Sequence, residues 1–181
     1  MGKKYDLLNE SLQRFIEAQT IFFVATAPLD REGHVNVSPK GLNTFRILGP
    51  RRVAYLDLTG SGIETAAHLK ENGRIVLMFC AFQGPPKIVR LYGKGSVVEP
   101  HQPEFSTLKN YFDPIEGERA IIAVELNRIS DSCGYSVPLL KHEGDRHQLT
   151  AWARNLGAEG LHKYRKEKNR SSIDALPGLS G

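Results

Sequence analysis

Cysteine is scarce in this chain: Cys80 and Cys133 are the only two among 181 residues, and they lie far apart. No pair has CxxC spacing, which excludes a disulfide framework and the common zinc-binding patterns, and predicts a reduced, cytoplasmic protein. Long hydrophobic runs are also missing. The longest, from Ile75 to Phe82, has the length of a strand and cannot span a bilayer.

The amino terminus, MGKKYDLLNES, lacks the features of a targeting segment. No apolar stretch follows the lysines, and position 6 is aspartate rather than serine or threonine. We therefore expect neither a secretory signal nor myristoylation.

The charge is mildly basic, with a net charge of +4 and a pI of about 9.1. Cationic residues are dispersed except in HKYRKEKNR (162–170), which we expect to be a solvated helix face. Because of this cluster, a nucleic-acid-binding scaffold is kept as a rival hypothesis, although we do not favour it.

Several catalytic and cofactor motifs are absent. There is no Walker A loop, no GxGxxG and no HExxH, and the glycines beside Ser61 do not form the GxSxG of a hydrolase. The six histidines are scattered, so we expect no bound metal. No side chain stands out as a general base, and the catalytic residues are left open.

Runs of β-branched and aromatic residues predict six strands. They cover residues 20–27, 34–38, 52–57, 74–82, 87–98 and 119–129. Most are joined by short turns, with few helices between them, and Gly-Pro pairs at 49–50 and 84–85 break the chain between strands. This pattern predicts a mainly β, α+β protein built on an antiparallel barrel.

Four helical segments are expected beside the strands. An apolar stripe at Leu8, Leu12, Phe15 and Ile16 predicts a first helix, capped by Asp6. The others cover residues 62–72, ending at an Asn-Gly pair, then 103–112 and 145–168, the last weakened by glycines at 157 and 160. The final DALPGLSG is expected to be an extended, loosely held end.

The stretch LDLTGSGIETAAHL (56–69) has two interpretations. Ser61 and Glu64 match the capping box, in which each side chain bonds the other's backbone amide. The same glycine-rich turn could present free amides and a helix N-terminus to a phosphate, which the carboxylate of Glu64 would oppose. Taken alone, the stretch favours the capping box.

The neighbouring motifs change that balance. Four segments follow one another along the chain: HVNVSPKG (34–41), VAYLDLTGSGIETAAHL (53–69), RIVLMFCAF (74–82) and KIVRLYGKGSVV (87–98). In this order they resemble the pyridoxamine 5′-phosphate oxidase-like family of FMN-binding split barrels. The best match is a small FMN-binding branch with FFVATA, SPKG, DLTGSG, SDSCGY and SIDxLPGL. These motifs stand here at residues 22–27, 38–41, 57–62, 130–135 and 172–179.

The resemblance implies one split-barrel FMN-binding domain over residues 1–181, with six antiparallel strands and flanking helices. It would comprise an N-terminal helix in 1–19, the barrel in 20–135 and a C-terminal helix in 145–168. The family also implies a homodimer with FMN at the interface.

By the same resemblance, the strand around Lys40 contacts the isoalloxazine edge and directs that lysine toward the phosphate. The turn at 58–65 contacts the ribityl phosphate, and Arg90 lines the pocket. In the loop 130–135, Tyr135 and Cys133 either cover the flavin or serve only packing and the interface. The implied cofactor-binding residues are Val35, Asn36, Val37, Ser38, Pro39, Lys40, Leu58, Thr59, Gly60, Ser61, Gly62, Thr65, Arg90, Cys133 and Tyr135.

Two departures from the oxidase limit what the resemblance implies. Where the oxidase has an Arg-Lys pair that grips the phosphate, this chain has Glu64 and Thr65, so the phosphate would rest on Thr59, Ser61, Thr65, the glycine amides, Lys40 and Arg90. The C-terminal Arg-x-His segment is also missing, although Asp145-Arg146-His147 has similar residue types. Trp152 could pack on the flavin, but we favour it as an anchor for the last helix.

The resulting hypothesis is an FMN-dependent oxidoreductase whose substrate and electron donor are open; oxidation of vitamin B6 is not expected. The alternatives are a split barrel for another cofactor, a deazaflavin or haem, and a flavin binder without turnover.

Overall fold

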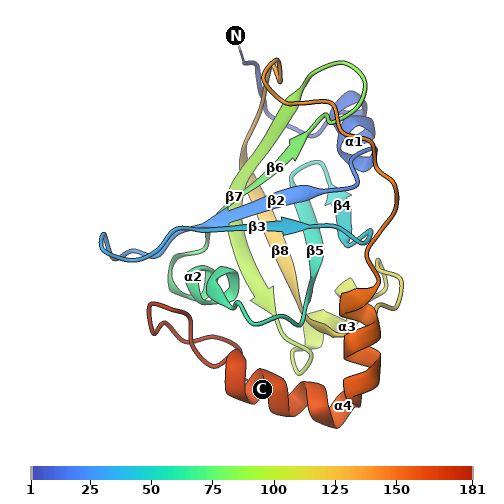
Figure 1. Cartoon of the computed structure of the whole chain (residues 1–181). Helices are drawn as coiled ribbons and strands as arrows, with labels where there is room; N and C mark the ends of the chain where they lie inside the picture. Colours follow the sequence, from blue (N-terminus) through green and yellow to red (C-terminus); the bar gives the residue numbers. More distant parts are fainter. Residues whose placement is uncertain (1, 181) are drawn as a thin grey trace.

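A single antiparallel sheet with helices around it makes up the structure, a computed structural model that describes residues 2–180 (Figure 1). The strands are β1 (Lys4–Tyr5), β2 (Phe22–Thr26), β3 (Asn36–Lys40), β4 (Phe45–Gly49), β5 (Arg52–Leu58), β6 (Arg74–Cys80), β7 (Ile88–Val98) and β8 (Glu118–Ser132). The helices are α1 (Glu10–Glu17), α2 (Glu64–Asn72), α3 (Pro103–Lys109) and α4 (Gln148–Lys168).

The strands follow the order β3-β2-β6-β7-β8-β5-β4, and β1 adds to β8. The sheet curls around its own core without closing, because no pairing joins β3 to β4 among the described residues. The predicted class, a mainly β split barrel with helices, is confirmed. No helix within residues 2–180 combines the length and apolar character needed to cross a membrane.

The expected number of strands, six, was too low: the structure has eight in its described part. The two additional strands carry little local signal. β1 is two residues long and exists through its pairing with β8. β4 follows two residues with left-handed backbone, Leu42 and Asn43, and it ends at Gly49, with Pro50 in the turn to β5. Pairing across the sheet, rather than local sequence, therefore defines both.

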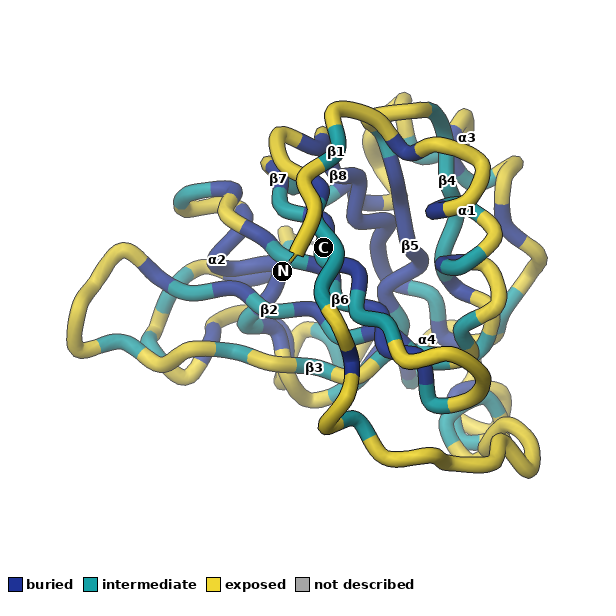
Figure 2. The backbone as a smooth tube through the Cα atoms, turned by 90° about the horizontal axis from the view of Figure 1, so that it is seen from above, coloured by how far each residue is buried: buried dark blue, intermediate teal, exposed yellow. Residues whose placement is uncertain are grey.

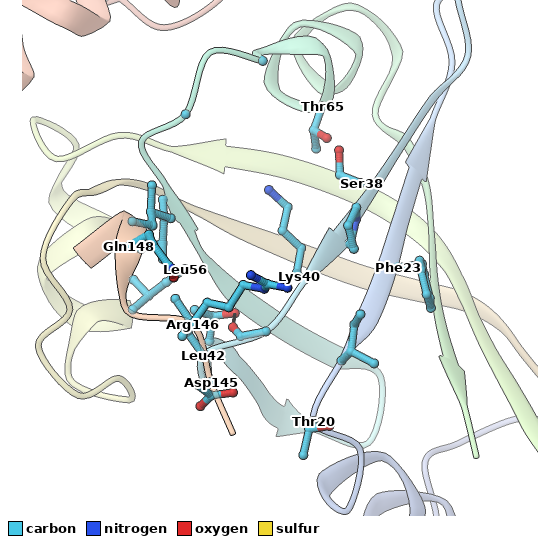
Figure 3. A pocket seen from close by; sticks show the side chains of 18 of the residues that line it. Thr20, Phe23, Ser38, Lys40, Leu42, Leu56, Thr65, Asp145, Arg146 and Gln148 are labelled. Carbon is cyan, nitrogen blue, oxygen red and sulfur yellow. Dashed lines mark hydrogen bonds between the residues drawn. The ribbon is translucent and has the colours of Figure 1, made fainter. Parts of the chain in front are cut away.

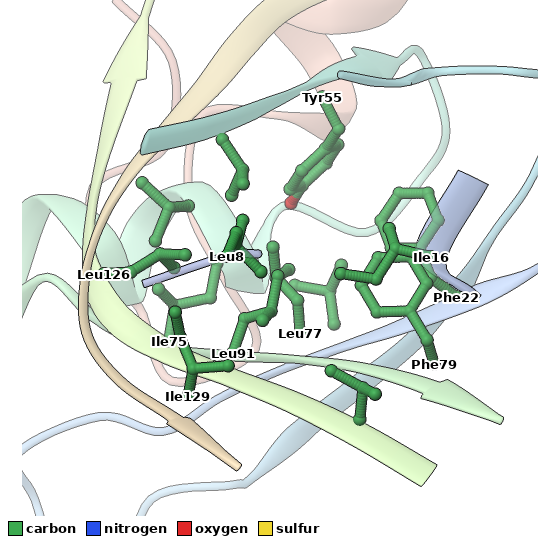
Figure 4. Packing of buried hydrophobic residues seen from close by; sticks show 14 of the residues in the cluster. Leu8, Ile16, Phe22, Tyr55, Ile75, Leu77, Phe79, Leu91, Leu126 and Ile129 are labelled. Carbon is green, nitrogen blue, oxygen red and sulfur yellow. The ribbon is translucent and has the colours of Figure 1, made fainter. Parts of the chain in front are cut away.

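The barrel interior is filled by aliphatic and aromatic side chains from both halves of the sheet (Figure 4). Phe22, Phe45, Phe79 and Tyr55 form a contiguous aromatic cluster with ring centroids 5.0–5.5 Å apart. Such contacts between aromatic rings add stability beyond the area that they bury. Figure 2 shows the buried residues concentrated in the central strands.

The apolar stripe of the first helix packs against this core as predicted, with Leu12 and Ile16 buried. The predicted cap, Asp6, is wrong. The helix begins later, and Asn9 caps it by accepting a hydrogen bond from the amide of Leu12 at 3.0 Å. Leu8 lies before the helix and is buried, which fixes the entry of the chain.

The C-terminal segment, residues 169–180, is firmly attached, so the expected loose end is wrong; residue 181 lies outside the described range. The amide of Leu179 donates to the carbonyl of Asn169 at 3.0 Å, and Lys70 donates to the carbonyl of Gly178 at 2.5 Å. The buried carboxylate of Glu99 accepts from the amide of Ser180 at 2.8 Å. Partners far away in the sequence therefore hold this segment in place.

Candidate functional site

A cavity of about 1220 Å³ lies between β3, the end of β5, the turn before α2 and the segment before α4 (Figure 3). Its lining is mostly apolar, with Leu56 and Leu58 among the lining residues, and it also includes polar side chains such as Ser38 and Thr65. A volume of this size accommodates a cofactor-sized molecule.

Ten of the fifteen residues predicted for the cofactor site line this cavity. They are Asn36, Ser38, Pro39, Lys40, Leu58, Thr59, Gly60, Ser61, Gly62 and Thr65. The structure thus brings β3 and the glycine-rich turn to one place, although they are distant in sequence.

The other five predicted residues lie elsewhere in the chain. Val35 and Val37 face outward around β3, with 71% and 62% of their surface exposed. Arg90 donates to Ser132 across the β7–β8 pair at 3.0 Å. Tyr135 is 83% exposed and Cys133 is exposed, both after the end of β8. Their contact with a cofactor stays a prediction.

Asn36 connects the cavity wall to the helix beneath the turn. Its amide nitrogen donates to the hydroxyl oxygens of Thr65 at 2.8 Å and Thr26 at 3.1 Å, and its oxygen accepts from Ser38 at 3.0 Å. Thr65 and Ser38 face each other in Figure 3. This network fixes the side-chain positions on the β3 side of the cavity.

His68 continues the network into the interior. Its Nδ1 lies 3.0 Å from the hydroxyl of Thr26, and the side chain is fully buried. Burial lowers the pKa of His68 despite the nearby carboxylates, so the imidazole is neutral at pH 7. No group of three or more His, Cys, Asp or Glu side chains within residues 2–180 is arranged to hold a metal ion.

An ion cluster lies at the base of the cavity. The buried carboxylate of Asp57 accepts from Nζ of Lys40 at 2.9 Å and from Nε of Arg119 at 2.7 Å. Burial alone raises the pKa of Asp57, but the charges of Lys40 and Arg119 outweigh it and lower the pKa to about 2. Sequence reasoning missed Asp57 and Arg119, although a lone acid within the apolar strand 52–58 was a signal that a cation must accompany it.

The carbonyl groups of the glycine-rich turn point toward Arg119 and Asn169. Arg119 donates through Nη1 to the carbonyl of Gly60 at 3.1 Å and through Nη2 to that of Gly62 at 2.8 Å. Asn169 donates to the carbonyl of Gly60 at 2.9 Å. The amides of residues 60–63 have no acceptor in the part of the chain that the structure describes.

Thr59 and Ser61 differ in what they can offer a ligand. Thr59 is buried; its hydroxyl donates to the carbonyl of Gly117 at 2.7 Å and accepts from Arg165 at 2.9 Å. Its hydrogen is therefore already used. Ser61 is exposed at the rim and is the turn hydroxyl with direct access to the cavity.

The capping box favoured on local evidence is wrong. The residue before α2 is Ile63, and no side chain caps the helix there. Instead, Oε1 of Glu64 accepts from the amide of Ile173 at 3.4 Å. The C-terminal segment thus binds this carboxylate, and the amide of Ser61 is left without it. The predicted end of the helix is confirmed, with Gly73 in a left-handed conformation at φ 71°.

The segment before α4 closes the cavity on its far side and was missed as a site element. Arg146 points across the cavity toward β3 in Figure 3, and Gln148 also lines the cavity. Trp152 does not line this cavity. It packs edge-on against Tyr164 with centroids 5.0 Å apart, which agrees with its expected anchoring role.

Comparison with protein families gives a match over most of the chain. The model for pyridoxamine 5′-phosphate oxidase matches residues 8–133. The pyridoxamine 5′-phosphate oxidase family protein ustO of Aspergillus flavus is 39% identical over 192 residues, covering 97% of this chain and 77% of that protein.

Solved structures share the fold at low sequence identity. The protein HupZ from Group A Streptococcus has a TM-score of 0.55 and 20% identity, covering 67% of this chain and 90% of its own. A protein described as a putative pyridoxamine 5′-phosphate oxidase from Lactobacillus delbrueckii has a TM-score of 0.53 and 18% identity, covering 70% and 98%. At these identities the likeness concerns the fold alone.

Proposed function

The chain belongs to the pyridoxamine 5′-phosphate oxidase family, and from this premise we propose that it is an FMN-binding flavoprotein that works as an oxidoreductase. The observation that carries the proposal is the glycine-rich turn: the amides of residues 60–63 have no acceptor within residues 2–180, and Gly60, Ser61 and Gly62 line a cavity large enough for a flavin. Backbone amides at a helix N-terminus are suited to a phosphate group.

The residues present fit FMN in spite of the missing Arg-Lys pair. The phosphate would rest on the turn amides and the hydroxyl of Ser61, with Lys40 nearby. In the ion cluster the charges of Lys40 and Arg119 (+2) and Asp57 (−1) leave one positive charge. The positive charge of this cluster favours an anion in the cavity and counteracts the repulsion from the carboxylate of Glu64, which also lines it.

The ring system would lie along β3. Ser38 and Thr65 offer hydroxyl groups for the polar edge of the isoalloxazine, and their positions are fixed by Asn36. Leu56 and Leu58 supply apolar surface below it. A flat, partly polar ligand requires this combination of apolar area and a few placed hydrogen-bonding groups.

When bound, the flavin supplies hydride or electron transfer. The contribution of the chain is binding, orientation and charge, the last through the ammonium of Lys40 near the phosphate. Oxidation of vitamin B6 is not part of the proposal, because the oxidase's Arg-Lys and Arg-x-His elements are not present here.

The test is a binding measurement on the purified protein. We expect a flavin absorbance spectrum after incubation with FMN and gel filtration, and a rise in melting temperature that grows with FMN concentration. Haem and a deazaflavin, tested in the same way, are the matched alternatives. A protein that neither retains FMN nor is stabilised by it would refute the proposal, and greater stabilisation by either alternative would replace it.

A further inference from the structure

The turn that would hold the phosphate is built from inside the protein. We propose that Arg119 and Asn169 are positioning residues that make this site selective for a phosphate-bearing flavin over riboflavin. The inference rests on the proposed function and assigns a role to two residues that would not themselves touch the cofactor phosphate.

Arg119 and Asn169 donate hydrogen bonds to the carbonyl groups of the turn. Arg119 bridges the carbonyls of Gly60 and Gly62, at 3.1 and 2.8 Å, while its Nε is bound to Asp57. Asn169 accepts from Nη1 of Arg119 at 2.9 Å and donates to the carbonyl of Gly60 at 2.9 Å. Both side chains are almost completely buried, at 5% and 1% exposure.

The bonds to the carbonyl groups also set the directions of the turn amides, because each peptide unit is planar and trans. In such a unit the carbonyl and the following N–H point in opposite directions, and no cis peptide occurs within residues 2–180. A carbonyl of Gly60 held by Arg119 therefore turns the N–H of Ser61 away from Arg119. The carbonyl of Gly62 does the same for the N–H of Ile63. A longer contact, 3.4 Å from Asn169 to the carbonyl of Ser61, orients the N–H of Gly62.

The charge of Arg119 is directed toward the protein interior. The guanidinium of Arg119 is paired with the carboxylate of Asp57, and four of its five N–H groups donate to acceptors within the protein. It therefore acts on the phosphate through backbone dipoles and not as a direct ion pair. This arrangement would replace the Arg-Lys pair, whose positions are Glu64 and Thr65 here.

Asn169 is itself held in place by the end of α4 and by the C-terminal segment. It ends α4, where its amide donates to the carbonyl of Arg165 at 2.8 Å, and its own carbonyl accepts from Leu179. The C-terminal segment thus sets the position of Asn169, and Arg165 contacts Thr59 from the same helix at 2.9 Å. The end of the chain is in this way coupled to the start of the proposed phosphate site.

The experiment compares FMN with riboflavin, which differ only in the phosphate. Asn169→Ala removes one donor from the carbonyl of Gly60 and frees Arg119 to move. We expect on the order of tenfold weaker binding of FMN, corresponding to about 1.4 kcal/mol, with riboflavin affinity unchanged. Asn155→Ala, an exposed asparagine on the same helix, is the control and should leave both affinities as they are.

A conservative variant separates positioning from folding. Arg119→Lys keeps the charge beside Asp57 but loses the fork that bridges Gly60 and Gly62, so it should also lower the preference for FMN over riboflavin. If either variant does not fold, amide NMR of the wild-type protein takes its place: the amide protons of Ser61, Gly62 and Ile63 should shift with FMN and not with riboflavin.

The outcomes are distinguishable. A wild-type protein that binds neither flavin defeats the proposed function, and this inference with it. A wild-type protein that binds FMN while the variants keep the same ratio of FMN to riboflavin affinity defeats this inference alone. Equal losses of affinity for FMN and riboflavin would also defeat this inference alone, because a general structural role weakens the binding of both flavins.

Discussion

Asp57 is the residue on which the two cations of the site depend. It is 1% exposed and bound by both Lys40 and Arg119. A buried charge that loses its partner strongly destabilises the fold, whereas an intact buried ion pair changes the free energy of folding little. The geometry of the turn, which Arg119 holds, therefore rests on a carboxylate that a ligand would never need to touch.

This dependence gives a prediction about pH. The folded pKa of Asp57, about 2, is below its ordinary value of 3.8, so the ion cluster stabilises the fold above pH 4. That contribution, on the order of 2 kcal/mol at about 1.4 kcal/mol per pKa unit, is lost as the pH falls from 4 to 2. Asp57→Asn should be less stable at pH 7 by roughly 3–5 kcal/mol, and the difference from wild type should narrow at low pH.

Urea denaturation at pH 7, 4 and 3 measures this difference. Asp6→Asn, at an exposed position, serves as the control and should differ from wild type by less than about 0.5 kcal/mol at pH 7. A gap between Asp57→Asn and wild type that stays constant over the same range would show that Asp57 does not carry the ion cluster.

At this scale the sequence predicted a part of the site and could not predict the rest. The glycine-rich turn and the strand with Lys40 have local patterns, and the structure brings them together. Arg119 lies 57 positions from Gly62, and Asn169 lies 109 from Gly60. No local spacing links such residues. Glu64 was assigned to a capping box for the same reason, because its partner, Ile173, belongs to the other end of the chain.

At the scale of elements, one glycine divides α4 into two parts that contribute to different regions of the site. Gly157 has φ 68° and ψ 176°, and α4 changes direction along the base of the molecule in Figure 1. The first part carries Gln148 to the cavity, and the second ends at Asn169 beneath the turn. The contact between Trp152 and Tyr164 joins the two parts.

Gly157→Ala should therefore destabilise the protein by about 1–3 kcal/mol, because this backbone conformation is accessible almost only to glycine. It should also weaken FMN binding by shifting Asn169 relative to the turn. The midpoint of urea unfolding and an FMN titration measure the two effects. Ala158→Ser, at the next and exposed position, should change stability by less than about 0.5 kcal/mol. Unchanged stability in Gly157→Ala would contradict the proposed strain.

The elements themselves were largely predictable because periodicity is a local property. All six expected strands and the helices near 62–72, 103–112 and 145–168 are present, with shifts at their ends. The misses were β1, β4 and the C-terminal segment. Each owes its structure to partners elsewhere: β8 for β1, β5 for β4, and Lys70 with Glu99 for the last residues.

At the scale of the whole molecule, the residues left outside the cavity become informative. β3 is an end strand of the sheet, and the β2–β3 hairpin reaches outward from the body in Figure 1. Its outer face carries Val35 and Val37, both largely exposed. An exposed apolar edge of this kind is a surface for pairing with another chain. Arg90 and Tyr135, which also lie away from the cavity, could reach a flavin only if a second copy supplied them.

We therefore predict a homodimer that forms through the β3 edge and completes the flavin site. Wild-type protein should sediment at about twice the chain mass of 20.2 kDa. Val37→Lys should shift it toward the monomer, because the dimer would bury an unpaired charge, and should weaken FMN binding in parallel. Tyr111→Lys, at an exposed aromatic just beyond α3, is the control and should affect neither property. A wild-type monomer that binds FMN with full affinity would show that one chain contains the whole site, and Arg90, Cys133 and Tyr135 would then have no part in it.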